Sequence, residues 1–235
     1  MKKIVFMGIS EKAHALLVLG RLLTVLGHKV LLVDSTIAQS IRGYLPHAYA
    51  TSAVLDFEGM DVAYGYLTPD QLERGLAQAG TLPSYDIMLV DTDHTEFVFR
   101  LNLSQCDKRV WCWDGRRLSL EKNEELMLRL GLQDAESPVT FFEMLAPAIP
   151  GHLAAWRAEM RMRHIQWEET VFRFPLDERD VAADLNNQHH GRIDLRGLTG
   201  AYRNTLLMML EQLGDCDRKA ARRAWSIARK KVRVW

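Results

Sequence analysis

The sequence has few cysteines and no excess of either charge, and both features exclude classes of protein. The three cysteines among 235 residues, Cys106, Cys112 and Cys216, lack metal-ligand spacing. They argue against a zinc site or a disulfide framework and favour reduced thiols. Basic and acidic residues number 30 each, so net charge gives no general attraction to nucleic acid or membrane. We therefore expect a cytoplasmic protein.

The chain also lacks long hydrophobic runs, internal repeats and low-complexity linkers. No stretch is long enough to span a bilayer. Met1-Lys2-Lys3 resembles the positive start of a signal peptide, but the apolar run that follows ends too early, at Gly8–Lys12. A hydrophobic content of 48% is ordinary for a folded domain, and this length suits a single α/β domain.

The first 34 residues form the pattern around which the chain is organised. Lys3–Met7 is a short apolar run that predicts a buried strand, and Ala13–Leu26 is rich in helix-forming leucine and alanine. Lys29–Val33 predicts a second buried strand, with Asp34 at its carboxyl end. Ligands of open α/β sheets bind beyond the carboxyl ends of the strands. The turn Gly8–His14 is therefore the expected site of any chemistry.

The remainder of the chain continues the alternation of strands and helices. Further strands are predicted at 48–57, 60–66, 87–90, 108–113 and 168–175, the first two as an edge hairpin. Further helices are predicted at 68–79, 119–130, 153–163, 177–185 and 198–213. Residues 137–150 give no clear pattern, and residues 186–192 are predicted to be a polar loop. The pattern predicts the α/β class.

Two segments resemble nucleotide-binding motifs. The run Met7-Gly8-Ile9-Ser10-Glu11-Lys12-Ala13-His14 is similar to KGGxGKTT, and Ser84–Thr92 (SYDIMLVDT) is similar to YDxxxIDTPP. The chain thus resembles the ParA/MinD-type deviant Walker ATPases. That resemblance implies a Rossmann-like P-loop NTPase fold over residues 1–214, with a mostly parallel sheet flanked by helices. It also implies a nucleotide site built from Gly8, Lys12, Asp34 and Asp91.

The same comparison indicates that the nucleotide site is degenerate. Met7 replaces the signature lysine, Ile9 and Glu11 replace glycines, and Ala13 and His14 replace the hydroxyl pair. A glycine-rich loop cradles phosphate with its backbone N–H groups, and the glycines permit the close approach. Like charges about 4 Å apart, at an effective dielectric of about 20, repel by roughly 4 kcal/mol, which makes a carboxylate beside phosphate costly. Without the hydroxyl, the loop lacks a magnesium ligand.

Other residues leave alternatives open. Asp91 is either a remnant magnesium ligand or a helix N-cap. Thr36 stands where relatives usually carry an acidic residue, and no asparagine lies between Asn123 and Asn186 to contact adenine. The adjacent residues Asp93 and His94, like His189 and His190, do not have the spacing of metal ligands.

The last 21 residues differ in charge from the rest. Residues 215–235 hold eight lysines or arginines against two aspartates. Alanines and Trp225 recur at three- and four-residue steps, which predicts a helix with one apolar face. Two interpretations remain open: an arm that contacts anionic membrane, nucleic acid or an acidic protein, or a last helix docked on the body. The arm residues are Arg218, Lys219, Arg222, Arg223, Trp225, Arg229 and Lys230.

The resemblance favours a non-catalytic, TadZ-like adaptor that helps to position or assemble a larger bacterial complex, without nucleotide or metal. Met7, Ile9 and Glu11 lie where relatives dimerise across the nucleotide, so we expect a homodimer or a stable hetero-complex through that face. We expect the protein in the cytoplasm, with peripheral contact at the inner membrane if the tail binds lipid. One alternative is an ATPase that uses ATP and Mg²⁺ with Lys12, Asp34 and Asp91. Another is a nucleic-acid-binding partition-type protein.

Overall fold

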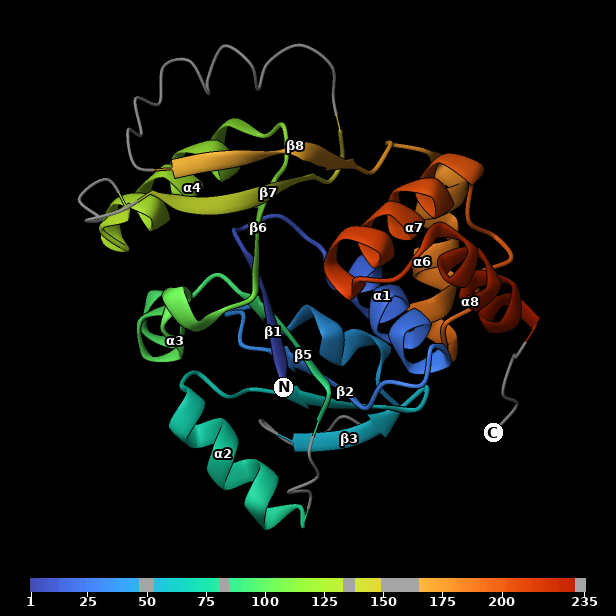
Figure 1. The fold of residues 1–235 in the computed structure, drawn as a ribbon, viewed down its shortest axis with the longest axis horizontal. Helices are drawn as coiled ribbons and strands as arrows, with labels where there is room; N and C mark the ends of the chain where they lie inside the picture. Colours follow the sequence, from blue (N-terminus) through green and yellow to red (C-terminus); the bar gives the residue numbers. More distant parts are fainter. Residues whose placement is uncertain (47–52, 81–84, 133–137, 149–164, 231–235) are drawn as a thin grey trace.

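An eight-stranded sheet forms the centre of the molecule in the computed structural model, which describes residues 1–46, 53–80, 85–132, 138–148 and 165–230 (Figure 1). The strand order is β3-β4-β2-β5-β1-β6-β7-β8. Neighbouring strands are parallel except β3, which is antiparallel to β4. The strands are β1 (Lys2–Met7), β2 (Val30–Asp34), β3 (Ala53–Phe57), β4 (Met60–Tyr64), β5 (Ile87–Thr92), β6 (Lys108–Trp113), β7 (Val139–Leu145) and β8 (Ile165–Arg173).

Helices cover both faces of this sheet (Figure 1). On one face lie α1 (Ala13–Val25), α6 (Glu178–His190), α7 (Gly200–Gly214) and α8 (Arg218–Lys230). On the other lie α2 (Pro69–Gln78), α3 (Thr95–Leu101) and α4 (Arg117–Arg129). Two short 3-10 helices lie in connections: η1 (Ser40–Tyr44) between β2 and β3, and η2 (Leu103–Gln105) between α3 and β6. The mostly parallel sheet flanked by helices confirms the predicted fold class.

Alternate residues of the strands divide the core into two layers. Ile4 and Phe6 of β1 pack with α1, α7 and α8, whereas Val5 and Met7 pack on the side of α2, α3 and α4. Side chains of a strand point alternately to its two faces, which explains the division. Because both faces are covered, the central strands are apolar throughout, as expected of a parallel sheet.

The helices predicted at 68–79 and 119–130 and the predicted edge hairpin are confirmed as α2, α4 and the pair β3–β4. Thr68 caps α2 by accepting a hydrogen bond from the backbone N–H of Gln71, and Pro69 is the first helical residue. Helix α4 ends at Arg129, and Gly131 follows its C-cap Leu130 with a φ of 63°, which suits a glycine. The hairpin around Glu58-Gly59 forms the antiparallel edge of the sheet. The expected helix at 153–163 and the start of the expected strand at 48–57 lie outside the described residues.

Three parts of the chain differ from expectation. Residues 137–150, which gave no clear pattern, contain β7, paired with β6 and β8. The short helix α3 was not predicted. The predicted loop at 186–192 is wrong as far as His190, because α6 continues through it. Asn187 lies on the buried side of α6 and is fixed by hydrogen bonds, so its turn-forming tendency is overridden.

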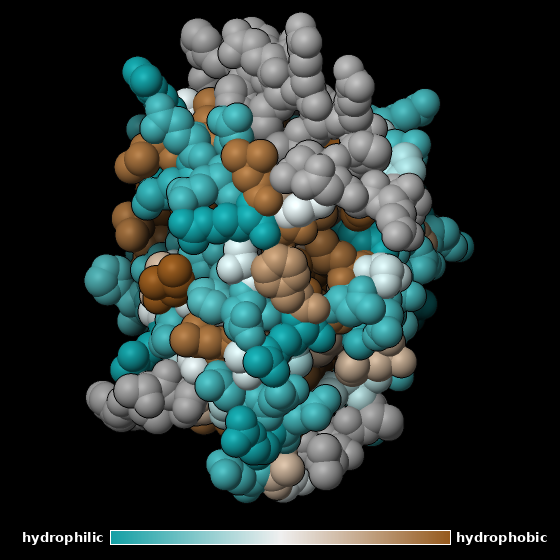
Figure 2. All heavy atoms as spheres, turned by 90° about the vertical axis from the view of Figure 1, so that its left-hand side faces the viewer, coloured by the Kyte–Doolittle hydropathy of each residue, from teal (hydrophilic) through white to brown (hydrophobic). Residues whose placement is uncertain are grey.

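The face that carries α2, α3 and α4 is largely hydrophilic (Figure 2). Hydrophobic side chains appear there in small separate groups and in the floor of a hollow near the centre. Exposed hydrophobic residues on this side include Phe99, Leu118 and Leu128. Scattered residues of this kind are normal for a protein surface. Within the described ranges, no helix is long and apolar enough to cross a membrane.

The basic tail helix is docked on the body. Its apolar face packs against α1 and α7 as part of the same core cluster, with Ala221, Ala224, Trp225 and Ala228 all buried. The guanidinium of Arg21 in α1 donates a hydrogen bond to the carbonyl oxygen of Ala228 at 2.9 Å. Of the two open interpretations, the docked helix is therefore the one the structure has. Removing α8 would therefore remove buried core side chains.

Candidate functional site

The loop between β1 and α1 lies at the carboxyl edge of the sheet, in its centre. Gly8, the first loop residue, has a φ of 120°, and a Cβ there would lie 2.4 Å from the carbonyl oxygen of Cys112. Only glycine fits such a position, on grounds of both conformation and space. The loop is thus held tightly against β6, and its path is fixed before any ligand is considered.

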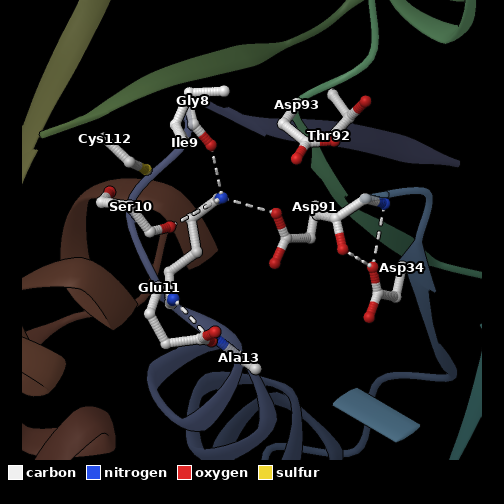
Figure 3. A network of polar contacts seen from close by, with 12 residues as sticks. Gly8, Ile9, Ser10, Glu11, Ala13, Asp34, Asp91, Thr92, Asp93 and Cys112 are labelled. Carbon is white, nitrogen blue, oxygen red and sulfur yellow. Dashed lines mark hydrogen bonds and ion pairs between the residues drawn. The ribbon is translucent and has the colours of Figure 1, made fainter. Parts of the chain in front are cut away.

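The carboxylate of Glu11 binds the start of helix α1. Its Oε1 accepts hydrogen bonds from the backbone N–H groups of Lys12, at 3.0 Å, and Ala13, at 2.8 Å (Figure 3). The first N–H groups of a helix have no partner within the helix, and the helix dipole makes that end attractive to anions. This is the place where a phosphate binds at a helix start. Here the chain supplies its own anion.

The side chain of Lys12 is turned inward. Its ammonium group donates to the carbonyl oxygens of Gly8, at 2.9 Å, and Ser10, at 3.2 Å, and lies 2.7 Å from Asp91 Oδ1 (Figure 3). Two of its three donors form these hydrogen bonds, and the ion pair with Asp91 balances its charge. Burial alone would lower the pKa of Lys12, but the Asp91 carboxylate outweighs it and holds that pKa above its usual value. Lys12 is therefore a buried, charged residue paired with Asp91.

Asp34 and Asp91 lie side by side in the register of β2 and β5. Asp34 accepts hydrogen bonds from the N–H and hydroxyl of Thr36 and from the N–H of Ile41. Burial raises the pKa of Asp34. Burial also raises the pKa of Asp91 to about 7, with Lys12 opposing the rise and Asp34 adding to it. Asp91 is not a helix N-cap, because α3 begins after His94.

The segments that follow β2 and β5 are bonded directly to each other. The hydroxyl of Ser35 lies 2.9 Å from that of Thr92, and the N–H of Ile37 donates to Asp93 Oδ1 at 2.9 Å. We call them the switch segments, since the resemblance to the deviant Walker ATPases implies that segments at these positions respond to nucleotide. In this structure they are joined by hydrogen bonds that involve the side chains of Ser35, Thr92 and Asp93.

Asn123 of α4 is part of the site, and sequence reasoning missed this role. Its Oδ1 accepts a hydrogen bond from the N–H of Ile9 at 3.1 Å, and its Nδ2 donates to the carbonyl oxygen of Cys112 at 3.3 Å. Asn123 is 0% exposed. Leu126 and Met127 lie three and four residues after it, so all three share the buried face of α4. A polar residue on an apolar helix face was the available signal.

The predicted site residues fall into two groups. The loop group comprises Gly8, Lys12, Asp34 and Asp91, which the structure brings together. The three predicted contact residues beside this group differ in exposure. Ile9 is half-buried and Glu11 is exposed, whereas Met7 is fully buried against the layer of α2, α3 and α4. Met7 was predicted on an interaction face, which is wrong because its position in β1 directs it into the core.

The second group lies on α8, on the outer side of α1 and α7 (Figure 1). Trp225 is buried, which corrects its assignment to an exposed arm. The exposed members of this group are Arg218, Lys219, Arg222, Arg223, Arg229 and Lys230. Among the described residues, no group of three or more histidine, cysteine, aspartate or glutamate side chains could hold a metal ion. His189 and His190 close the last turn of α6.

Comparison with known proteins defines the fold. No family model and no curated protein matches the sequence. Among solved structures, a plasmid partition protein from Borrelia burgdorferi bound to AMPPNP is 14% identical with a TM-score of 0.56, covering 90% of this chain and 98% of that one. The MinC:MinD cell division complex from Aquifex aeolicus is 14% identical with a TM-score of 0.53, covering 100% and 98%.

A ParA family ATPase from Chlorobium tepidum is 15% identical with a TM-score of 0.52, covering 95% of this chain and 98% of that one. These neighbours are similar over nearly their full lengths. The chain therefore has the fold of the ParA/MinD-type P-loop ATPases, as the two sequence motifs implied. At this level of identity the likeness concerns the fold alone.

Proposed function

We propose that this protein is a non-catalytic member of the ParA/MinD-like proteins, a TadZ-like pseudo-ATPase. It acts as an adaptor or positioning protein in the assembly of a larger bacterial complex, in the cytoplasm or at the inner face of the membrane. The observation that carries the proposal is the self-supplied anion at the start of α1. The carboxylate of Glu11 takes the two N–H groups on which a nucleotide phosphate would depend.

The residues present do not fit a magnesium–nucleotide complex, which the fold would otherwise suggest. Two of the loop N–H groups donate to Glu11, and that of Ile9 donates to Asn123. Ala13 has no hydroxyl for magnesium, and the Lys12 ammonium is held inward by Gly8, Ser10 and Asp91. A phosphate would have to displace the Glu11 carboxylate and then remain beside it, at a cost of several kcal/mol.

The bonds between the two switch segments support the same proposal. In an ATPase of this fold, the segments after β2 and β5 would respond to the nucleotide. Here Ser35 is bonded to Thr92 and Ile37 to Asp93 without one. A protein whose switch segments are already joined presents one constant surface. A constant surface suits an adaptor.

The decisive experiment is nucleotide binding by the wild-type protein. A ligand at one hundred times its Kd stabilises a fold by about 2.7 kcal/mol, which raises the Tm of a domain of this size by roughly 5–10 °C. We expect no such rise with millimolar Mg-ATP and no heat of binding by calorimetry. Clear binding or turnover that Lys12→Ala abolishes would contradict the proposal. Asp93→Ala is the comparison variant for Lys12→Ala, because it removes a nearby carboxylate and leaves the Lys12–Asp91 pair in place.

The ATPase alternative has one observation in its favour. Lys12, Asp34 and Asp91 are brought together in one buried cluster, as a working site would require. The same binding experiment decides between the two functions. The alternative of a nucleic-acid-binding partition-type protein depends on the exposed cations of α8 and is tested by salt-dependent retention of DNA.

A nucleotide-independent homodimer or stable hetero-complex belongs to the same proposal. With Met7 buried, the candidate contact residues at the loop are Ile9 and Glu11. The MinC:MinD complex among the structural neighbours is a complex of MinD with a second protein, which supports a protein partner for this chain. Light scattering should show an assembly larger than the 235-residue monomer, alone or with its partner. A monomer at tens of micromolar, both alone and mixed with each purified candidate partner protein, would contradict this.

A further inference from the structure

A groove of about 1070 Å³ runs between α7 and α8. The two helices are joined by the short connection Asp215–Asp217, so they lie as a hairpin. Leu207, Met208 and Trp225 supply the apolar part of its lining. We call this feature the α7–α8 groove. Helices α7 and α8 lie on the side of the sheet opposite to α2, α3 and α4 (Figure 1).

The lining residues follow one side of each helix. On α7 they include Arg203, Leu207 and Glu211, which are four residues apart. On α8 the lining extends from Arg218 to Lys230 at steps of three and four residues. Residues at these steps share a helix face, and 12 residues of helix rise about 18 Å. The groove is therefore long enough to hold three turns of another helix.

The groove is strongly basic. Among the described residues that line it, Glu211 is the one acidic side chain, and six are basic: Arg196, Arg203, Arg218, Arg222, Arg229 and Lys230. All six are exposed, and Arg196 already pairs with Asp194. Arginine and lysine keep their charges in water while their stems extend along apolar surface. The result is an apolar floor between basic walls.

We propose that the α7–α8 groove is the docking site for an amphipathic helix of a partner protein. The partner helix carries leucine-like residues on one stripe and glutamate or aspartate on both sides of that stripe. The stripe packs on Leu207, Met208 and Trp225, and the flanking carboxylates meet the arginines and lysine of the walls. Recognition of a helix in a groove has this combination of apolar anchors and complementary charge. The inference names the class of partner for the adaptor function proposed above.

The shape of the groove disfavours two other anionic ligands. A helix that enters a lipid surface must present bulky apolar residues outward. Here Trp225 is 7% exposed, whereas the basic side chains of the lining are exposed. Duplex nucleic acid would use the cations through its phosphates but gain nothing from an apolar floor, and base stacking requires an accessible aromatic ring. A helix with both acidic and apolar residues uses the whole groove.

The test uses full-length protein and a fluorescent helical peptide of about 18 residues, matched to the length of the groove. The peptide carries leucine at positions i, i+4, i+7 and i+11 and glutamate on both sides of that stripe. A second peptide has lysine in place of glutamate. Fluorescence anisotropy at moderate salt should show saturable binding of the first peptide, about tenfold or more tighter than of the second.

Two charge-reversed variants of α8 localise the binding. R222E/R229E changes the groove, whereas K219E/R223E makes the same change of net charge on residues that line a different hollow, beside Val25 and Leu26. All four side chains are exposed, so both variants should retain the circular dichroism spectrum and Tm of the wild type. We expect R222E/R229E to weaken peptide binding by about tenfold or more, and K219E/R223E by less than about threefold.

Each other outcome would overturn the proposal. Equal loss in both variants would mean diffuse attraction to the charge of α8. Binding of duplex DNA or of phosphatidylglycerol vesicles that is lost in R222E/R229E, with no peptide binding, would assign the groove to nucleic acid or lipid. The assay contains no nucleotide, so its failure is distinct from a failure of the non-catalytic proposal. Conversely, a finding that the protein binds Mg-ATP would contradict the non-catalytic proposal and leave the peptide result unchanged.

Discussion

Replacing Glu11 with alanine removes the carboxylate that binds the start of helix α1. In the wild-type protein that carboxylate accepts hydrogen bonds from the N–H groups of Lys12 and Ala13. After the change, water must satisfy both groups, and the positive end of the helix dipole loses its counter-charge. Because Glu11 is exposed, water can reach them and the fold should persist. The expected effect is a measurable loss of stability without unfolding.

The magnitude follows from the two contributions. Loss of a side-chain cap costs about 1 kcal/mol, and loss of the charge–dipole interaction costs about 0.3–1 kcal/mol. The sum, roughly 1–2 kcal/mol, should lower the Tm by roughly 2–8 °C in a domain of this size. Glu11→Gln keeps an acceptor oxygen and removes only the charge. It should therefore lose only about 0.3–1 kcal/mol.

The assay is thermal and urea unfolding with and without inorganic phosphate. With Glu11 replaced, phosphate can bind the N–H groups at the helix start, so Glu11→Ala should gain more stability from phosphate than the wild type gains. Glu125→Ala is the matched control, because Glu125 forms an exposed pair with Arg129 within α4, away from a helix start. It should cost about 0.5 kcal/mol or less and show the wild-type phosphate response. An equal phosphate response in the wild type and Glu11→Ala would refute the reasoning.

Two further predictions concern α1 and α8. Burial lowers the pKa of His14, whose Nε2 accepts a hydrogen bond from Asn187. The folded state therefore holds a neutral imidazole ring. The stability that this neutral ring contributes should be lost as the pH falls below about 6.5, the ordinary pKa of histidine. Urea unfolding between pH 7 and 5 should show a flatter pH dependence for His14→Gln than for the wild type, and equal slopes would exclude His14 as the cause. Trp225→Ala should cost about 3–5 kcal/mol by the same assay, as for a core aromatic residue, whereas Ser226→Ala on the exposed side should change stability by about 0.5 kcal/mol or less. A small effect of Trp225→Ala would mean that α8 contributes little to the core.

The central part of the fold could be predicted from the sequence because its signals are local. Apolar runs ending in Asp34 and Asp91 defined two strands, and Thr68-Pro69 defined a helix start. Strand β7 could not be recognised, because its residues Val139–Leu145 depend on pairing with β6 and β8 for their conformation. Tertiary pairing of that kind leaves no signature in a short window of sequence.

The candidate site was predicted in its composition but not in its geometry. Sequence comparison identified Glu11 as an obstacle to phosphate, and the structure adds that its carboxylate is itself the bound anion. The inward turn of Lys12 depends on where Asp91 lies, which is a matter of strand order. Met7 is buried because its side chain points to the face of the sheet that α2, α3 and α4 cover. Alignment of the motif does not show to which face a strand residue points.

The hydrogen bond between Ile9 and Asn123 has a consequence for how the molecule unfolds. The loop that begins α1, on one face of the sheet, is bonded through it to α4, on the other face. The two hydrophobic layers are separated by the sheet, and each could otherwise melt at its own temperature. With the loop joining them at the carboxyl edge, opening either layer disturbs the other, which favours a single cooperative transition. The loop between β1 and α1 thus connects the two halves of the core.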